Sequence, residues 1–193
     1  YYIQCMFTGD SRKEYLNPLT WRGDITQSGG GVFMDVGVHM LDWLQLLFGS
    51  PYAIYAQHRK ITTKLQDKGE NFATIVVEFP DNIIANISTT HNDIGYKFRW
   101  EVRIYGTDGV LTLLDTGRQY KTLQMIKENQ VLYEYIEPEW WKQANIRALH
   151  TIIESIKEHK APAVSYDHAR SVMKTVFASY DSARKGKRIV LGM

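Results

Sequence analysis

The sequence predicts an α+β fold, in which helices cover one face of a large, open and mainly antiparallel sheet. Short apolar runs of strand length follow one another through residues 52–136, with short turns between them. Such turns join antiparallel neighbours, because parallel strands need long crossovers. A single helical segment precedes these runs and two follow them, with a short strand at each end of the chain. This segregated order of strands and helices is typical of the α+β class.

The expected strands carry the alternation of a half-buried sheet. Apolar Val102 and Ile104 flank Arg103, and Leu123 and Met125 flank Gln124. One face of the sheet is therefore expected to pack on a core, while the other face is more polar or meets a partner. The expected strands are residues 1–7, 52–58, 72–79, 83–90, 98–105, 110–114, 120–127, 131–136 and 188–191.

Residues that favour helix ends delimit the three helical segments. Gly49 and Pro51 terminate the first, while Asp167 is placed to cap the last and Gly186 to end it. The expected helices span residues 32–48, 139–158 and 167–185, and residues 10–28 are expected to be polar and irregular.

Composition places the chain among ordinary soluble domains. It has 193 residues, of which 44% are hydrophobic and 23% charged, enough for a single domain with a real core. The net charge of +2 gives no support for a nucleic-acid partner. No signal peptide or membrane-length apolar run is apparent, and the single Cys5 cannot form an internal disulfide. We expect a cytoplasmic protein without a membrane partner.

The most informative stretch is residues 28–43. Gly29–Gly31 opens a helix that carries Asp35, His39 and Asp42. At 100° per residue these three polar side chains share one arc of the helix. Histidine exchanges protons near neutral pH, and a carboxylate one turn away can orient or support it. The apolar side chains expected on a different, core-facing arc are Phe33, Met40, Leu44 and Leu47.

Two readings of this helix remain open on local grounds alone. An Asp-x-x-x-His pair is common on solvated helices, where it is an ordinary surface pair. Three successive glycines are costly in entropy, so they indicate close approach by a ligand or by another stretch of backbone.

The whole chain resembles a known family. The stretch Ser-Gly-Gly-Gly-Val-Phe-Met-Asp-Val-Gly-Val-His-Met-Leu-Asp at 28–42 resembles the C-terminal domain of the Gfo/Idh/MocA oxidoreductases, which include inositol dehydrogenase and glucose–fructose oxidoreductase. Three further segments resemble the family in the same order and spacing. They are residues 71–82, 104–111 and 178–190.

The resemblance implies a protein of two halves. In the family, an N-terminal Rossmann domain binds NAD or NADP, and the C-terminal α+β domain forms the substrate pocket. The open sheet of that second domain packs on another subunit, which implies a homodimer or homotetramer. This chain has neither the Gly-x-Gly-x-x-Gly motif nor the family's Glu-Lys-Pro motif. We therefore expect residues 1–193 to form only the second half, with the nucleotide-binding domain missing and the isolated chain inactive.

The resemblance also assigns expected roles to residues. His39 matches the family's acid–base histidine, and Asp35 matches a carboxylate that either supports the histidine or binds substrate. Arg22 and Trp21 lie in a segment resembling the substrate-side loop, where arginine can grip an anionic group and tryptophan can stack on a sugar. The alternative for this pair is a loop anchored by a buried tryptophan. His91 is a further candidate for the pocket.

Two functions from different classes follow. The first is the substrate-binding and catalytic half of an NAD(P)-dependent oxidoreductase that acts on a sugar, cyclitol or related alcohol. The second is a non-catalytic ligand-binding or oligomerisation module of the same fold. Asp42 is expected to bond within the domain rather than to act in catalysis. No histidine pair has the spacing of a metal site, and no metal is expected.

Overall fold

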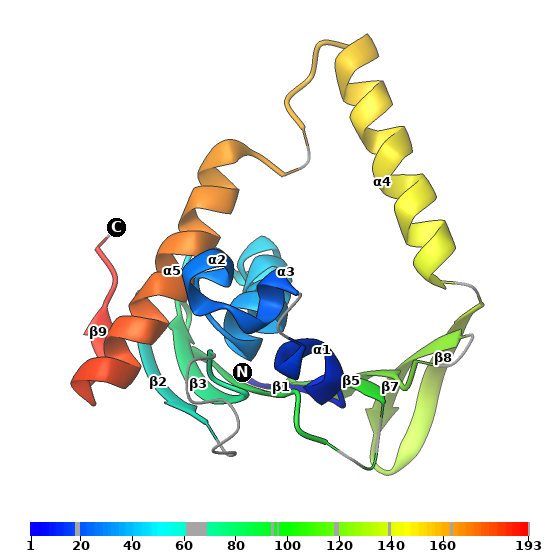
Figure 1. Ribbon diagram of the computed structural model, residues 1–193. Coiled ribbons are helices and arrows are strands. Elements are labelled where there is room, and N and C mark those ends of the chain that lie inside the picture. Colours follow the sequence, from blue (N-terminus) through cyan, green and yellow to red (C-terminus); the bar gives the residue numbers. More distant parts are fainter. Residues whose placement is uncertain are drawn as a thin grey trace.

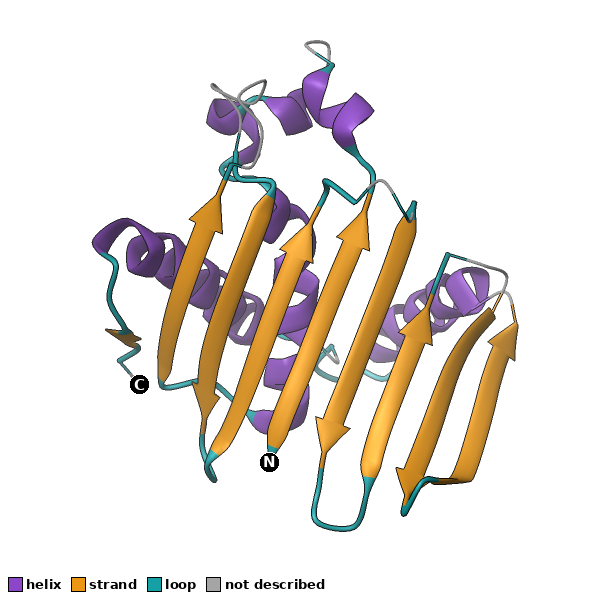
Figure 2. Ribbon diagram, turned by 90° about the horizontal axis from the view of Figure 1, so that it is seen from below, coloured by secondary structure: helices purple, strands orange, loops and turns teal. Residues whose placement is uncertain are grey.

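The computed structural model describes residues 1–17, 20–60, 69–93, 95, 97–117, 120–138, 140–162 and 164–192. Its nine strands form one open sheet, and the long helices lie on one side of it, which confirms the predicted α+β class (Figure 1; Figure 2). The strands are β1 (Tyr2–Gly9), β2 (Ala53–Arg59), β3 (Phe72–Phe79), β4 (Ile83–Thr90), β5 (Phe98–Tyr105), β6 (Val110–Asp115), β7 (Tyr120–Lys127), β8 (Gln130–Pro138) and β9 (Ile189–Val190).

The sheet has the order β8-β7-β6-β5-β1-β4-β3-β2-β9. All neighbouring pairs are antiparallel except β1 and β4, which are parallel. The hairpins β3–β4 and β7–β8 turn at Asp81-Asn82 and Glu128-Asn129, where both central residues have positive φ. This backbone twist matches that of the flanking strands, and Asn and Asp tolerate it well.

The helices differ from expectation mainly before residue 32. Residues 10–28 were expected to be irregular, but they contain three short helical segments. Helix α5 is capped by Ser165, whose side chain accepts a hydrogen bond from the backbone N–H of His168, so the prediction of Asp167 as the cap was wrong. The helices are α1 (Arg12–Leu16), the 3₁₀ segment η1 (Trp21–Gly23), α2 (Ile25–Ser28), the π segment η2 (Phe33–Gly37), α3 (Val38–Phe48), α4 (Trp140–Lys157) and α5 (Tyr166–Lys185).

A π turn at Phe33–Gly37 opens the first long helix. A π turn has i→i+5 hydrogen bonds, so the 100° spacing assumed for Asp35, His39 and Asp42 does not apply within this segment. Gly37 is required here, because a Cβ built on it would lie 2.1 Å from the Phe33 ring. Leu47, expected in the core, is 60% exposed instead.

The core lies between the sheet and helices α3 and α5. Phe33, Met40 and Leu44 are fully buried there, and α5 packs along β2 and against α3. From the sheet, alternate residues of the central strands point into the same core. These are Ile3, Cys5, Phe7, Ala73, Ile75, Val77, Phe79, Ile83, Ala85 and Ile87. Among the described residues no helix lies on the opposite face, and α4 projects away from the body (Figure 1; Figure 2).

The segment Ile25–Phe48 is long and apolar enough, by length and composition, to cross a membrane, which the sequence analysis did not anticipate. In the structure Gly29 breaks it with a left-handed turn, and half of its most apolar window is buried inside the protein. Its apolar composition is therefore accounted for by its place in the core.

Candidate active site

A pocket of ≈ 240 Å³ lies where η1, the glycine run and the start of α3 meet. It brings together four of the five predicted site residues: Asp35, His39, Arg22 and Trp21. The fifth, His91, is buried behind Asp35 and does not line this pocket. The remaining lining residues are Tyr15, Ser28, Gly30, Gly31, Met34 and Val38.

Asp35 is the hub of the polar contacts in this pocket. Its Oδ2 accepts a hydrogen bond from the Tyr15 hydroxyl at 3.2 Å and lies 3.3 Å from His91 Nε2. Arg22 Nε lies 3.5 Å from Oδ1. Burial is the largest single influence and raises the pKa of Asp35, but the contacts with His91, Arg22 and Tyr15 together lower it more, so the pKa lies below its ordinary value. Asp35 is therefore an ionised acceptor at neutral pH.

Tyr15 is a neutral donor to this carboxylate. Burial, followed by the charge of Asp35 and their hydrogen bond, raises the pKa of the Tyr15 hydroxyl well above its ordinary value. The Tyr15 ring also lies 4.7 Å from the His91 ring, between centroids. Tyr15 and His91 thus hold Asp35 from the protein side and leave its pocket side open.

His39 presents a different environment. It is the second residue of α3, directly after the π segment, it is exposed, and its imidazole has no hydrogen-bond partner among the described residues. Asp35 and His39 share the pocket without a bond between them, because the carboxylate is held by Tyr15, His91 and Arg22. The imidazole is thus accessible to a molecule bound in the pocket.

Trp21 and Arg22 form the outer wall. The Trp21 side chain is 53% exposed, so it is not the buried loop anchor that the sequence left open. The Arg22 guanidinium carbon lies 5.0 Å from the centroid of the Trp21 ring, a cation–π arrangement. Beside Asp35, this pair offers a flat aromatic surface and a positive charge.

The glycine run approaches another stretch of backbone. A Cβ on Gly31 would lie 1.9 Å from the carbonyl oxygen of Glu70, and a Cβ on Gly69 would lie 2.4 Å from the Gly31 nitrogen. Of the two explanations left open by the sequence, the approach of backbone therefore accounts for Gly31. Sequence reasoning missed Tyr15, Glu70 and Tyr180, because no local motif marks them.

Asp42 lies outside the pocket and bonds to a neighbouring helix. Its Oδ1 is 2.7 Å from Nε2 of His168 on α5. This contact ties α3 to α5, as expected of a residue with a structural role. No group of three or more His, Cys, Asp or Glu residues that could hold a metal occurs within the part of the chain that the structure describes.

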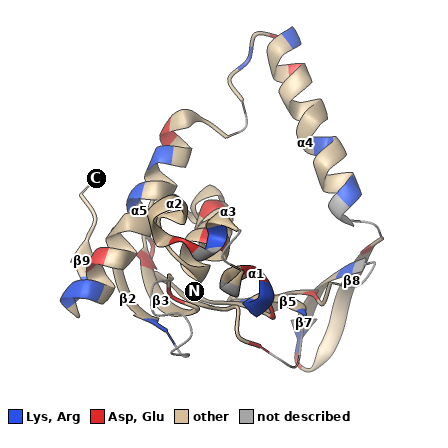
Figure 3. Cartoon of the chain, viewed as in Figure 1, with Lys and Arg blue, Asp and Glu red and all other residues tan. Residues whose placement is uncertain are grey.

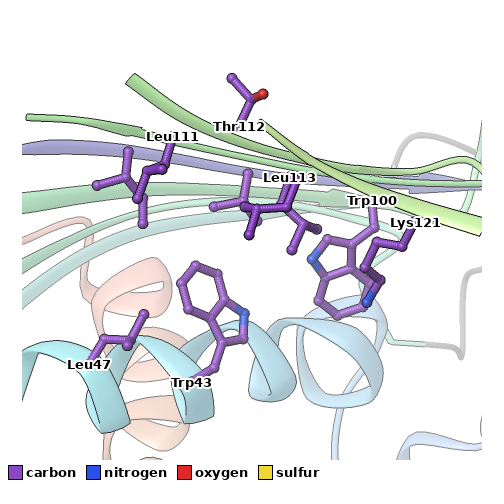
Figure 4. A pocket seen from close by; sticks show the side chains of 10 residues that line it. Trp43, Leu47, Trp100, Leu111, Thr112, Leu113 and Lys121 are labelled. Carbon is purple, nitrogen blue, oxygen red and sulfur yellow. The ribbon is translucent and has the colours of Figure 1, made fainter. Parts of the chain in front are cut away.

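A second pocket, of ≈ 320 Å³, has a different character (Figure 4). It lies between α3 and strands β5–β7, and apart from Thr112 and Lys121 its lining is apolar. Lys121 is its one ionisable group, and burial is the largest influence on the pKa of this lysine, which it lowers. Without an acid–base pair, this pocket is a poor candidate for catalysis.

A family model for the GFO/IDH/MocA C-terminal domain matches residues 1–112, more than half of the chain. The chain belongs to the GFO/IDH/MocA family. A curated relative is D-xylose 1-dehydrogenase (NADP(+)) 2 of Haloferax volcanii, which is 25% identical over 167 residues. The match covers 84% of this chain and 48% of the relative, so the chain spans about half the length of that enzyme.

Solved structures of other proteins share this fold. Levoglucosan dehydrogenase in complex with NADH superposes with a TM-score of 0.84 at 16% identity, over 100% of this chain and 58% of that one. The WlbA dehydrogenase of Bordetella pertussis, in complex with NADH and UDP-GlcNAcA, gives 0.77 at 19% identity, over 100% and 55%. These relatives are dehydrogenases that were solved with NADH.

The glycine run of this GFO/IDH/MocA domain does not fit the pyrophosphate of a dinucleotide. Backbone N–H groups that open a helix can bind a phosphate only when they are free. Here the N–H groups of Gly31 and Phe33 donate to the Glu70 carboxylate, and that of Val32 donates to the Glu70 carbonyl. The nicotinamide cofactor of the family therefore has no phosphate cradle at this helix.

Proposed function

We propose that this chain forms the substrate-binding and proton-transferring half of an NAD(P)-dependent dehydrogenase that acts on an alcohol group of a sugar. The observation that carries the proposal is the pocket in which an accessible imidazole, His39, lies beside an ionised carboxylate, Asp35. The dehydrogenases named for D-xylose and levoglucosan support a sugar-like substrate.

In this proposal His39 is the general acid–base. Its imidazole takes the proton of the hydroxyl group that is oxidised and returns it in the reverse direction. A base within hydrogen-bond reach accelerates such a step by about 10²–10⁴-fold. The nicotinamide, when bound by the family's other domain, supplies the hydride chemistry.

Asp35 then serves as an acceptor for a second sugar hydroxyl. The three contacts with Tyr15, His91 and Arg22 fix its position, so that the hydroxyl beside it is held in register with His39. Trp21 offers the flat surface on which a sugar ring stacks, and Arg22 balances the charge of Asp35.

We further propose that the face of the sheet without helices is covered by a second copy of the chain. Its exposed apolar side chains include Tyr2 and Ile84 on the adjacent central strands β1 and β4. Lys and Arg are interspersed with Asp and Glu along the described helices and strands (Figure 3). This distribution does not favour a nucleic-acid partner.

The test uses the intact polypeptide together with its nucleotide-binding domain. Turnover is followed by reduced nicotinamide with D-xylose, levoglucosan and inositol, each with NAD and NADP. We expect His39→Ala to lower kcat by about 10²–10⁴-fold, because the proton acceptor is lost. Cofactor affinity should stay unchanged, since His39 lies on the substrate side.

The matched control is His150→Ala, because His150 is exposed on α4 and distant from the pocket in sequence and fold. This variant should keep the full turnover. Near-normal turnover of His39→Ala would overturn the assignment of the base. An intact protein that binds no cofactor and turns over none of the sugars would favour the non-catalytic module instead.

A further inference from the structure

Glu70 is a buried carboxylate that binds the start of the helix bearing the proposed catalytic pair. Only 6% of the residue is exposed, and it lies just before β3, far from Gly31 in sequence. Its Oε2 accepts from the Gly31 N–H at 2.9 Å and its Oε1 from the Phe33 N–H at 3.0 Å. Its backbone carbonyl accepts from the Val32 N–H at 2.8 Å. One residue thus receives three successive N–H groups that the helix itself leaves unsatisfied.

Tyr180 of α5 contacts the same carboxylate, and we call Glu70 and Tyr180 together the clamp. Its hydroxyl donates to Glu70 Oε1 at 2.8 Å and lies 3.3 Å from the Gly31 nitrogen. A Cβ on Gly30 would lie 2.1 Å from the Tyr180 oxygen, so the fit leaves no room for a side chain. The start of the helix is therefore fixed to both the sheet and α5.

The clamp reaches the pocket by two routes that meet at Asp35. Gly30 and Gly31 line the pocket themselves, and the Asp35 N–H donates to the Gly31 carbonyl at 3.0 Å. The other route runs from Asn71, the residue after Glu70, to His91, which contacts the Asp35 carboxylate. The backbone carbonyl of Asn71 accepts from the His91 N–H at 3.1 Å, and the His91 ring contacts Asp35.

We propose that Glu70, assisted by Tyr180, is a positioning residue of the active site that holds Asp35 in register with His39. This inference rests on the proposed function. Burial raises the pKa of Glu70, while the hydrogen bonds from Phe33, Tyr180 and Gly31 oppose this shift. A carboxyl group suits the position, because it offers two acceptor oxygens to two backbone donors and a hydroxyl. A displacement of about 1 Å at such a site can lower turnover by about 10²-fold.

The test compares three variants of the intact protein. Glu70→Gln keeps the size of the side chain but puts an amide N–H₂ where one acceptor was. Tyr180→Phe removes only the hydroxyl. It tests the same contact if Glu70→Gln does not fold. Thr175→Val is the matched control, because Thr175 is also buried on α5 and also bonds to the first long helix, but through Gln45 near its far end.

The first readout needs no substrate. Hydrogen–deuterium exchange at Gly31–Phe33 should become at least about tenfold faster in Glu70→Gln and should not change in Thr175→Val. The second readout is steady-state kinetics with the sugar that the wild type oxidises. We expect kcat to fall by about 10–10²-fold in Glu70→Gln and by less in Tyr180→Phe, with the KM for the cofactor unchanged.

Two outcomes would overturn the role of Glu70. One is unchanged exchange at Gly31–Phe33 in both clamp variants. The other is a kcat in the folded clamp variants that stays within about twofold of Thr175→Val. His39→Ala, measured in the same series, separates the two proposals. If His39→Ala keeps its turnover, the proposed function fails. If His39→Ala loses turnover while the clamp variants keep theirs, only the role of Glu70 fails.

Discussion

The imidazole of His58 on β2 packs between two aromatic rings, 5.5 Å from that of Phe33 and 4.6 Å from that of Tyr180 between centroids. Neither ring nitrogen has a hydrogen-bond partner among the described residues. Burial, with a smaller contribution from the charge of Arg59, lowers the pKa of His58 to about 4. The folded protein therefore holds this side chain in its neutral form.

This residue makes stability depend on pH. In the unfolded chain the imidazole is protonated with a pKa of about 6.5, whereas in the folded chain its pKa is about 4. The unfolded chain therefore binds more protons between these values, and folding stability falls as the pH drops from 6.5 to 4. We expect His58 to account for a loss of about 2 kcal/mol between pH 7.5 and pH 5. Urea unfolding of the wild type and His58→Phe at both pH values measures it.

His58→Phe keeps an aromatic ring at this position and removes the titration. Between pH 7.5 and pH 5, its free energy of unfolding should therefore fall by about 2 kcal/mol less than that of the wild type. An equal loss in both proteins would contradict the prediction. This role could not be predicted, because a histidine in a strand pattern says nothing about the rings that pack on it from α5 and from the π segment.

At the scale of elements, Gly31 and Gly186 are required for two different reasons. Gly31 is crowded by the backbone of Glu70, whereas Gly186, with φ of 63°, ends α5 in open space. An alanine at Gly31 must displace backbone, while an alanine at Gly186 meets only the strain of a left-handed conformation.

We expect Gly31→Ala to destabilise the protein by more than about 3 kcal/mol and Gly186→Ala by about 1 kcal/mol. Thermal unfolding of the two variants beside the wild type provides the comparison. Equal midpoints for the two variants would refute the close approach of Gly31 to Glu70.

Local patterns also explain which elements could be predicted. Strands β3, β4, β5 and β7 were predicted at their observed bounds, because alternation and turn residues are properties of neighbouring positions. The π turn at Phe33–Gly37 was not predicted, because the apolar residues of this segment follow the spacing of an ordinary α-helix. The same division holds in the site: Asp35 and His39 share one helix, whereas Tyr15 and Glu70 come to it through tertiary packing.

At the scale of the whole molecule, the proposed self-association rests on the uncovered face of the sheet. Ile84 is 45% exposed near the start of the central strand β4, and its partner Tyr2 on β1 stacks on Tyr105 of β5. A lysine at position 84 would have to lose its hydration in an apolar contact between two copies.

We therefore expect Ile84→Lys to weaken self-association by about tenfold or more. Sedimentation analysis of the intact protein at micromolar concentration measures this, with Leu149→Lys as the control. Leu149 is exposed as well, but it lies on α4 and outside the sheet. A wild type that sediments as a monomer would disprove the proposed pairing.

The position of β1 has a consequence for how the protein is made. Tyr2 pairs with Ile84 on one side and with Tyr105 on the other, so the first strand of this sequence joins two hairpin groups that are synthesised much later. Such a high contact order slows folding and leaves apolar segments exposed on the ribosome. The ladder β2–β3–β4 and the ladder β5–β8 can each form from local contacts, but they become one sheet only when β1 inserts between them. We therefore expect insertion of this strand to be a late step of folding, before which the apolar faces of both ladders are open to aggregation.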